Sequence, residues 1–115
     1  MKVNHLIKIK KKLQRRKTVI SSWSQISNAN LAEILCNKNF DCLTFDFEHG
    51  LFNISDLPNL LRVAEIKNKA TLVRLPNKNL EICRQVLDAG VDGIIIPNIS
   101  SELELKKIIN IILIY

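Results

Sequence analysis

The chain has 115 residues, enough for one domain with a modest core. Its 47% hydrophobic and 24% charged residues are typical of a globular protein and exclude a disordered chain. No apolar run reaches the roughly 18 residues of a membrane span, and charged first residues argue against a secretory signal. We therefore expect a cytoplasmic protein that does not bind a membrane.

The net charge of +6 is concentrated in the first 17 residues, which hold eight basic side chains and no acidic one. The rest of the chain carries nine basic and eleven acidic side chains. Leu6, Ile9 and Leu13 recur at helical spacing, which predicts an amphipathic leader helix over 1–17. We interpret it as a capping helix whose lysines, like His5, are solvated. A nucleic-acid-binding arm is less favoured because no Phe, Tyr or Trp lies among the basic residues of this segment to stack on a base.

From residue 18 onward, strand-like and helix-like runs alternate. Asn28, Ser55 and Ser101 are expected to cap the first, second and last helices, and Gly90 to end the third. The expected elements are, in chain order, a strand at 18–23, a helix at 28–38, a strand at 42–48, a helix at 55–68, a strand at 70–76, a helix at 79–90, a strand at 93–98 and a helix from 101.

The three cysteines, Cys36, Cys42 and Cys83, form no C-x-x-C pair and are odd in number. Their spacing does not match a zinc site, so we predict free thiols and no metal ligand among them.

Four strands that alternate with helices predict a parallel sheet with right-handed crossovers. An open doubly wound sheet and part of an eight-stranded barrel both fit this order. No G-x-G-x-x-G follows the first strand to favour the open sheet. Within 43–48 the odd positions are apolar and the even positions polar, which favours a barrel with helices outside. We predict an α/β fold, an incomplete TIM-type (β/α)8 barrel of about four units spanning 18–115.

Polar side chains gather where two of these strands end. Asp46, Glu48 and His49 follow one strand, and Arg74 lies at the same level of the next. A histidine beside an aspartate is a candidate base with its orienting carboxylate, and an arginine can bind a carboxylate or an oxyanion. The group suits proton abstraction next to a carbonyl. A salt-bridge cluster at the strand ends is the alternative.

Three segments, SSWSQISNANLAEILCNKNFDCLTFDFEHG, LVRLPN and LDAGVDGIIIPNI, resemble the first half of the HpcH/HpaI aldolases. These are metal-dependent class II pyruvate aldolases, and the resemblance runs from about Trp23 to about Glu104. It implies that His49 and Asp46 form the acid/base pair and that Arg74 holds the carboxylate and keto oxygen of pyruvate. The implied reaction is reversible cleavage of a 2-keto-3-deoxy or 4-hydroxy-2-oxo acid into pyruvate and an aldehyde.

The resemblance also implies lesser roles near the substrate. Glu48 is expected to organise the motif, and Asp88 to lie near the active site. Trp23 is expected to line the pocket, although a position in the core is the alternative.

The chain is shorter than this family, whose members have roughly 250 residues. The resemblance implies a divalent metal (Mg, Mn or Co) held by residues of later strands, so we expect none to be bound by this chain alone. It also implies a homo-oligomer, a trimer of dimers, whose formation here is doubtful. The apolar ending KKIINIILIY suggests a truncation. We expect an N-terminal fragment with little activity alone, or alternatively a non-catalytic keto-acid-binding or regulatory half-domain.

Overall fold

The protein is represented by a computed structural model that describes residues 2–113. Four strands form one sheet in the order β1-β2-β3-β4, and every neighbouring pair is parallel. This confirms the predicted α/β fold and the partial barrel. The elements are α1 (Lys2–Gln14), β1 (Ser21–Ser24), α2 (Ala29–Cys36), β2 (Cys42–Asp46), the short 3-10 helix η1 (Ile54–Asp56), α3 (Leu57–Ile66), β3 (Ala70–Arg74), α4 (Leu80–Ala89), β4 (Gly93–Ile95) and α5 (Glu102–Ile112).

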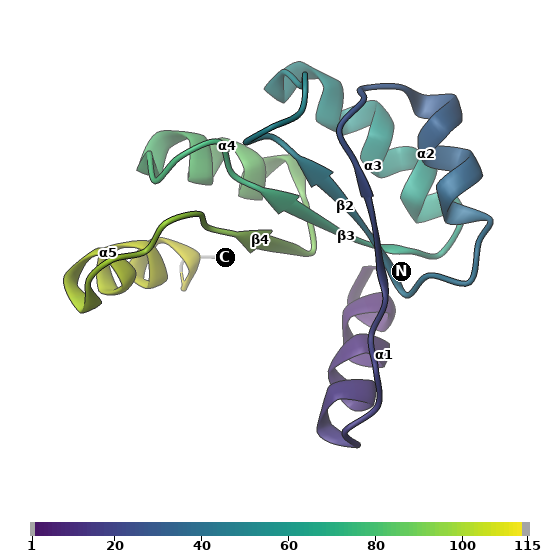
Figure 1. The fold of residues 1–115 in the computed structure, drawn as a ribbon, viewed down its shortest axis with the longest axis horizontal. Coiled ribbons are helices and arrows are strands. Elements are labelled where there is room, and N and C mark those ends of the chain that lie inside the picture. The colour runs from purple at the N-terminus through teal and green to yellow at the C-terminus, as the bar shows by residue number, and fades with distance from the viewer. Residues whose placement is uncertain (1, 114–115) are drawn as a thin grey trace.

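The core lies between the sheet and the helices that connect its strands. Helices α2, α3 and α4 lie along one side of the strands, and α1 lies beyond the end at which the strands begin (Figure 1). Leu43, Phe45 and Val73 point into the layer under these helices and are at most 1% exposed. Right-handed crossovers place each connecting helix on the same face, so the opposite face of the sheet would be the interior of a barrel.

The helix ends follow local capping chemistry, with one correction. The side chain of Asn28 accepts a hydrogen bond from the Leu31 N–H at 2.9 Å, and Gly90 ends α4 with a φ of 95°. Ser55 is not the cap of α3. The Asn53 N–H instead donates to Asp56 Oδ2 at 2.7 Å, which forms a 3-10 turn before α3 begins. The Asp56 carboxylate thereby satisfies a backbone N–H at the start of the turn, as the acidic residue of a capping box does.

The last helix is only partly buried. Ile108 and Ile111 face the core, whereas Ile109 and Leu113 are exposed. The final residues of the apolar ending, Ile114 and Tyr115, lie outside the described residues.

Helix α1 lies near the start of the strands and contacts β3. Lys12 pairs with Asp41, and the Ile20 N–H donates to the same carboxylate at 2.9 Å. The expected solvation of His5 is wrong, because its side chain is only 5% exposed. The predicted apolar face is only partly buried, since Leu6 and Ile9 are half-buried whereas Leu13 is 58% exposed. The buried His5 and the half-buried Lys12 therefore share the inner side of α1 with these two apolar residues.

The remaining sequence expectations concern cysteines and membranes. Cys36, Cys42 and Cys83 are free and buried, and burial raises the pKa of each thiol. Buried thiols with a raised pKa are poor nucleophiles. Among residues 2–113, no helix combines the length and the apolar character needed to cross a bilayer.

Candidate functional site

Asp46 and Arg74 are direct neighbours at the carboxyl ends of β2 and β3, where the register pairs them. The Arg74 Nε–H donates to Asp46 Oδ1 at 2.9 Å, and Nη2–H donates to Oδ2 at 2.7 Å. Asp46 is fully buried, so this two-pronged contact compensates a charge that water does not reach. Carboxyl ends of parallel strands are where barrel enzymes place their active sites.

Three further donors surround the Asp46 carboxylate. Gln25 Nε2 donates to Oδ2 at 3.2 Å, and the N–H groups of Glu48 and His49 donate to Oδ1 at 3.1 and 3.3 Å. The Arg74 guanidinium is the main cause that holds the pKa of Asp46 well below its ordinary value, in opposition to burial. Asp46 is therefore an ionised anchor around which the site is built.

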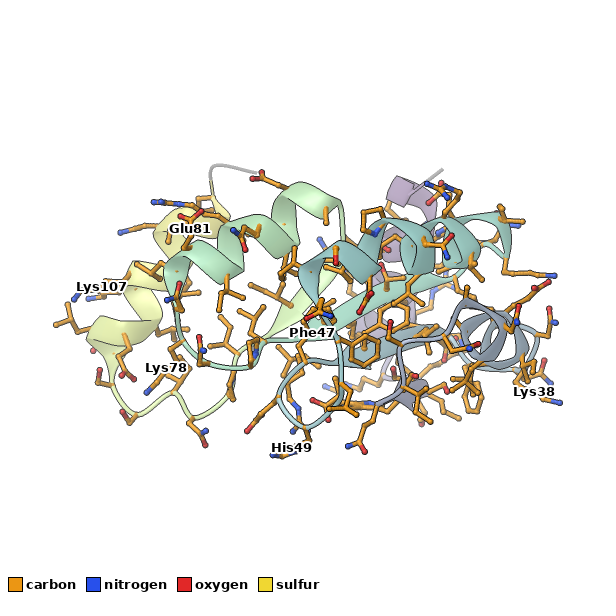
Figure 2. All side chains as sticks on the ribbon, turned by 90° about the horizontal axis from the view of Figure 1, so that it is seen from above. Lys38, Phe47, His49, Lys78, Glu81 and Lys107 are labelled. Carbon is orange, nitrogen blue, oxygen red and sulfur yellow. The ribbon has the colours of Figure 1, made fainter. Side chains whose placement is uncertain are left out.

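His49 contacts this anchor through Arg74. Its Nδ1 lies 2.9 Å from Arg74 Nη2, a hydrogen-bond distance. The same atom lies 4.0 Å from Asp46 Oδ2, so the predicted pair of His49 and Asp46 is close but is not joined by a hydrogen bond. A guanidinium only donates, so Nδ1 accepts and the neutral imidazole carries its proton on Nε2. Figure 2 shows Phe47 within the body of the molecule and His49 projecting from its edge.

Trp23 and Glu48 complete the surroundings of the guanidinium. Arg74 Cζ lies 4.9 Å from the centroid of the Trp23 ring, a cation–π distance. Glu48 Oε2 lies 3.4 Å from Arg74 Nε, and its Oε1 lies 3.6 Å from His49 Nε2. Trp23 is 46% exposed, so the alternative of a core tryptophan is wrong.

The structure does not bring Asp88 to this cluster. Asp88 is an exposed residue in the last turn of α4, which runs from the end of β3 back to the start of β4. The connecting helix of a βα unit is antiparallel to its strands, so its last turn lies at the opposite end of the sheet. A sequence motif cannot reveal this direction.

Two residues of the site were not predicted. Gln25 directly follows β1, the same edge that Trp23 occupies, and this position was the available signal. Gly50 donates its N–H to Asp46 O at 2.9 Å, and a Cβ there would lie 2.3 Å from that oxygen and 2.9 Å from Gln25 O. Only glycine lets the loop after β2 pack against the loop after β1.

The residues that the structure describes do not fit a metal ion. Within 2–113, no three His, Cys, Asp or Glu side chains are grouped so as to bind one. Both oxygens of Asp46 are already occupied by Arg74, Gln25 and two backbone N–H groups.

Comparison with known proteins agrees with this geometry. A sequence model of the HpcH/HpaI aldolase/citrate lyase family matches residues 20–114. The chain is 31% identical to a pyruvate aldolase of Rhizobium etli over 105 residues, and 26% identical to a hydroxypyruvate/pyruvate aldolase of Roseobacter denitrificans over 100 residues. These matches cover 90% and 87% of this chain and 40% and 39% of the relatives.

A solved structure gives the same result. The HpcH/HpaI aldolase of Desulfitobacterium hafniense superposes with a TM-score of 0.77 at 26% identity, over 87% of this chain and 39% of that one. The chain thus spans about 40% of the length of the aldolases that it matches. It belongs to the HpcH/HpaI aldolase/citrate lyase family.

Proposed function

We propose that this chain provides the carboxylate-binding and acid/base part of an aldolase site that acts on 2-keto-3-deoxy or 4-hydroxy-2-oxo acids. The observation that carries the proposal is the Asp46–Arg74–His49 arrangement, in which one guanidinium is fixed on a buried carboxylate and also reaches an exposed imidazole. Relatives named as pyruvate aldolases support pyruvate as the product. The cytoplasmic location and the oligomer stay predictions.

Arg74 is suited to bind the carboxylate of a keto acid. Its contacts to Asp46 and His49 use Nε and Nη2, so the two N–H groups of Nη1 are not part of this network. Asp46 and the Trp23 ring fix the guanidinium before a ligand arrives. A fixed donor loses little freedom on binding, which favours affinity and orientation.

Substrate binding is proposed to change the tautomer of His49. A ligand carboxylate competes for Arg74 Nη2, which releases Nδ1 of the imidazole. Nδ1 can then carry the proton toward Asp46 Oδ2, now 4.0 Å away, which leaves the Nε2 lone pair facing the ligand. Asp46 thereby orients the base only after the ligand is bound.

In the cleavage direction, His49 Nε2 takes the proton of the C4 hydroxyl. The C3–C4 bond then breaks, the aldehyde departs, and the electron pair moves onto C3 and the C2 oxygen as an enolate. The positive charge of Arg74 stabilises this oxyanion. A proton from water at C3 completes pyruvate, and His49 returns its proton to solvent.

Titration with pyruvate tests the proposal, with the His49 ring nitrogens observed by NMR. We expect saturable binding and a shift of the proton from Nε2 to Nδ1. Arg74→Lys keeps the charge but loses the two-pronged geometry, so affinity should fall about tenfold or more. Arg84→Lys in α4, whose guanidinium pairs with the exposed Glu81, is the matched control and should bind as wild type does. Equal binding by both variants would contradict the proposal.

Exchange of the pyruvate methyl protons in D₂O separates this function from a non-catalytic keto-acid-binding half-domain. The hydrogen bond from Arg74 to Nδ1 of His49 favours that alternative, because it leaves the proton on Nε2, the nitrogen that would have to act as the base. Binding without accelerated exchange would support it.

A further inference from the structure

A hollow lies at the opposite end of the sheet from His49. Its volume is about 450 Å³, within the general range of small-molecule sites of about 300–1,000 Å³. Its walls are α1 with the segment that follows it, and the loops that precede β2 and β3. The cavity is therefore built by the leader helix and the start of the strands.

The walls of this cavity are strongly basic. Asp41 is the one carboxylate among its described lining residues. Lys12 and the Ile20 N–H already hydrogen-bond to that carboxylate, and they hold the pKa of Asp41 below its ordinary value. The Lys69 ammonium donates to two backbone carbonyl oxygens. The lining cations are Lys8, Lys11, Lys12, Arg15, Lys17 and Lys69.

The direction of α1 is unusual for a solvated basic helix. Charged side chains of an amphipathic helix normally face water and apolar ones face the core. Here Lys8, Lys12 and Arg15 follow His5 at helical spacing and line the open cavity together with Ile9, although Lys8 and Arg15 also reach solvent, whereas Leu13 is 58% exposed. Lys11 and Lys12 offset the partial negative charge at the carboxyl end of α1, but this role does not account for Lys8, Lys17 or Lys69.

His5 is a second polar feature of this cavity. It is 95% buried, lines the cavity, and has an Nδ1 atom with no hydrogen-bond partner among the described residues. Buried polar atoms are normally paired, so this imidazole is suited to hydrogen-bond a polar ligand. Phe40 and Ile9 supply an apolar part of the wall.

We propose that this cavity binds a small organic polyanion that carries phosphate groups. Clustered lysines bind phosphate oxygens as point charges, and the excess of cations over carboxylates requires a ligand with several negative charges. The site is remote from Arg74 and His49, so the proposal is independent of the aldolase chemistry. Its occupant would also tie α1 to the loops before β2 and β3, so binding should stabilise the fold.

Calorimetric titration of the full chain with inorganic tripolyphosphate at fixed ionic strength tests the site. The variant Lys8→Gln/Arg15→Gln removes two lining cations. The matched control, Lys10→Gln/Arg16→Gln, removes two exposed cations of the same helix and its end that do not line the cavity. We expect saturable binding that weakens about tenfold or more in the first variant and less than about twofold in the second.

Three outcomes would overturn the proposal. Absence of saturable binding to the wild type would do so directly. Equal weakening by both double variants would show diffuse attraction to a basic helix. In that case a single-stranded oligonucleotide should bind both variants equally weakly, as for a nucleic-acid-binding arm. Citrate as a second probe separates the ligand classes, since binding as tight as that of tripolyphosphate would contradict a preference for phosphate.

Discussion

The two ends of the sheet differ in how completely their charged side chains are paired. At the carboxyl end, Asp46 is fully buried, yet five hydrogen bonds from Arg74, Gln25 and two backbone N–H groups surround it. At the amino end, cations line an open cavity in which the described residues include one carboxylate, and His5 Nδ1 has no hydrogen-bond partner among them. A saturated network fixes its members in advance, whereas an unsaturated one is completed by a ligand. The first end is therefore ready for chemistry, and the second is suited to recognition.

Among the variants that probe this difference, loss of Arg74 should lower the free energy of unfolding the most. Arg74→Met leaves a buried carboxylate without its counter-charge, so we expect the free energy of unfolding to fall by about 3–5 kcal/mol. Urea denaturation measures it. Arg84→Met, which breaks an exposed pair with Glu81, should cost at most about 0.5 kcal/mol. Similar losses in the two variants would show that the buried charge of Asp46 does not need Arg74 as its counter-charge.

Gly50→Ala should have an intermediate effect at the same end. The new Cβ would clash with Asp46 O, Gln25 O and the Phe52 ring, so the two loops must move apart. We expect a loss of about 1–3 kcal/mol in urea denaturation, together with weaker pyruvate binding because Gln25 moves away from Asp46. An unchanged stability would mean that the loops can separate at no cost.

Asp41→Asn should have the smallest effect, because it breaks a partly exposed pair that holds α1 at the amino end. We expect a loss of at most about 1 kcal/mol at neutral pH. The folded-state pKa of Asp41 is lowered, so its contribution is present above the ordinary value of about 4 and disappears as the pH falls below it.

Urea midpoints of wild type and Asp41→Asn, measured from pH 7 to pH 3, check this prediction. The two curves should converge toward the acid end. A difference that grows as the pH falls would reverse the sign of the linkage and contradict the pairing with Lys12.

Several parts of the fold could be predicted from local pattern. Alternation in 43–48 placed Leu43 and Phe45 under the helices, and Gly90 and Asn28 marked helix ends correctly. These features depend on residues close in sequence, where periodicity and capping chemistry act. Ser55 failed as a cap because Asn53 and Asp56 compete for the same turn, and local rules do not rank such neighbours.

The partners within the site depended on contacts across the sheet. The positions of Asp46, His49 and Arg74 at the ends of two successive predicted strands indicated that these residues meet, because parallel strands end at one edge of a sheet. Which of them hydrogen-bond was decided by strand register, which sets Arg74 directly beside Asp46 and places the guanidinium between the carboxylate and the imidazole. Asp88 lies apart from this cluster because helix direction, rather than motif proximity, determines the end of the sheet at which a residue lies.

By itself the sequence determined the α/β order, the parallel sheet and the residue types at its carboxyl end, since these follow from periodicity and from motifs short enough to read along the chain. Only the tertiary structure decided which way α1 faces. The apolar spacing of Leu6, Ile9 and Leu13 pointed one side of that helix inward, yet Leu13 is exposed, and His5, Lys8 and Lys12 line the cavity beside Ile9. The physical reason is that Asp41 and the loops before β2 and β3 offer charge and hydrogen-bond partners that a helix read in isolation does not contain.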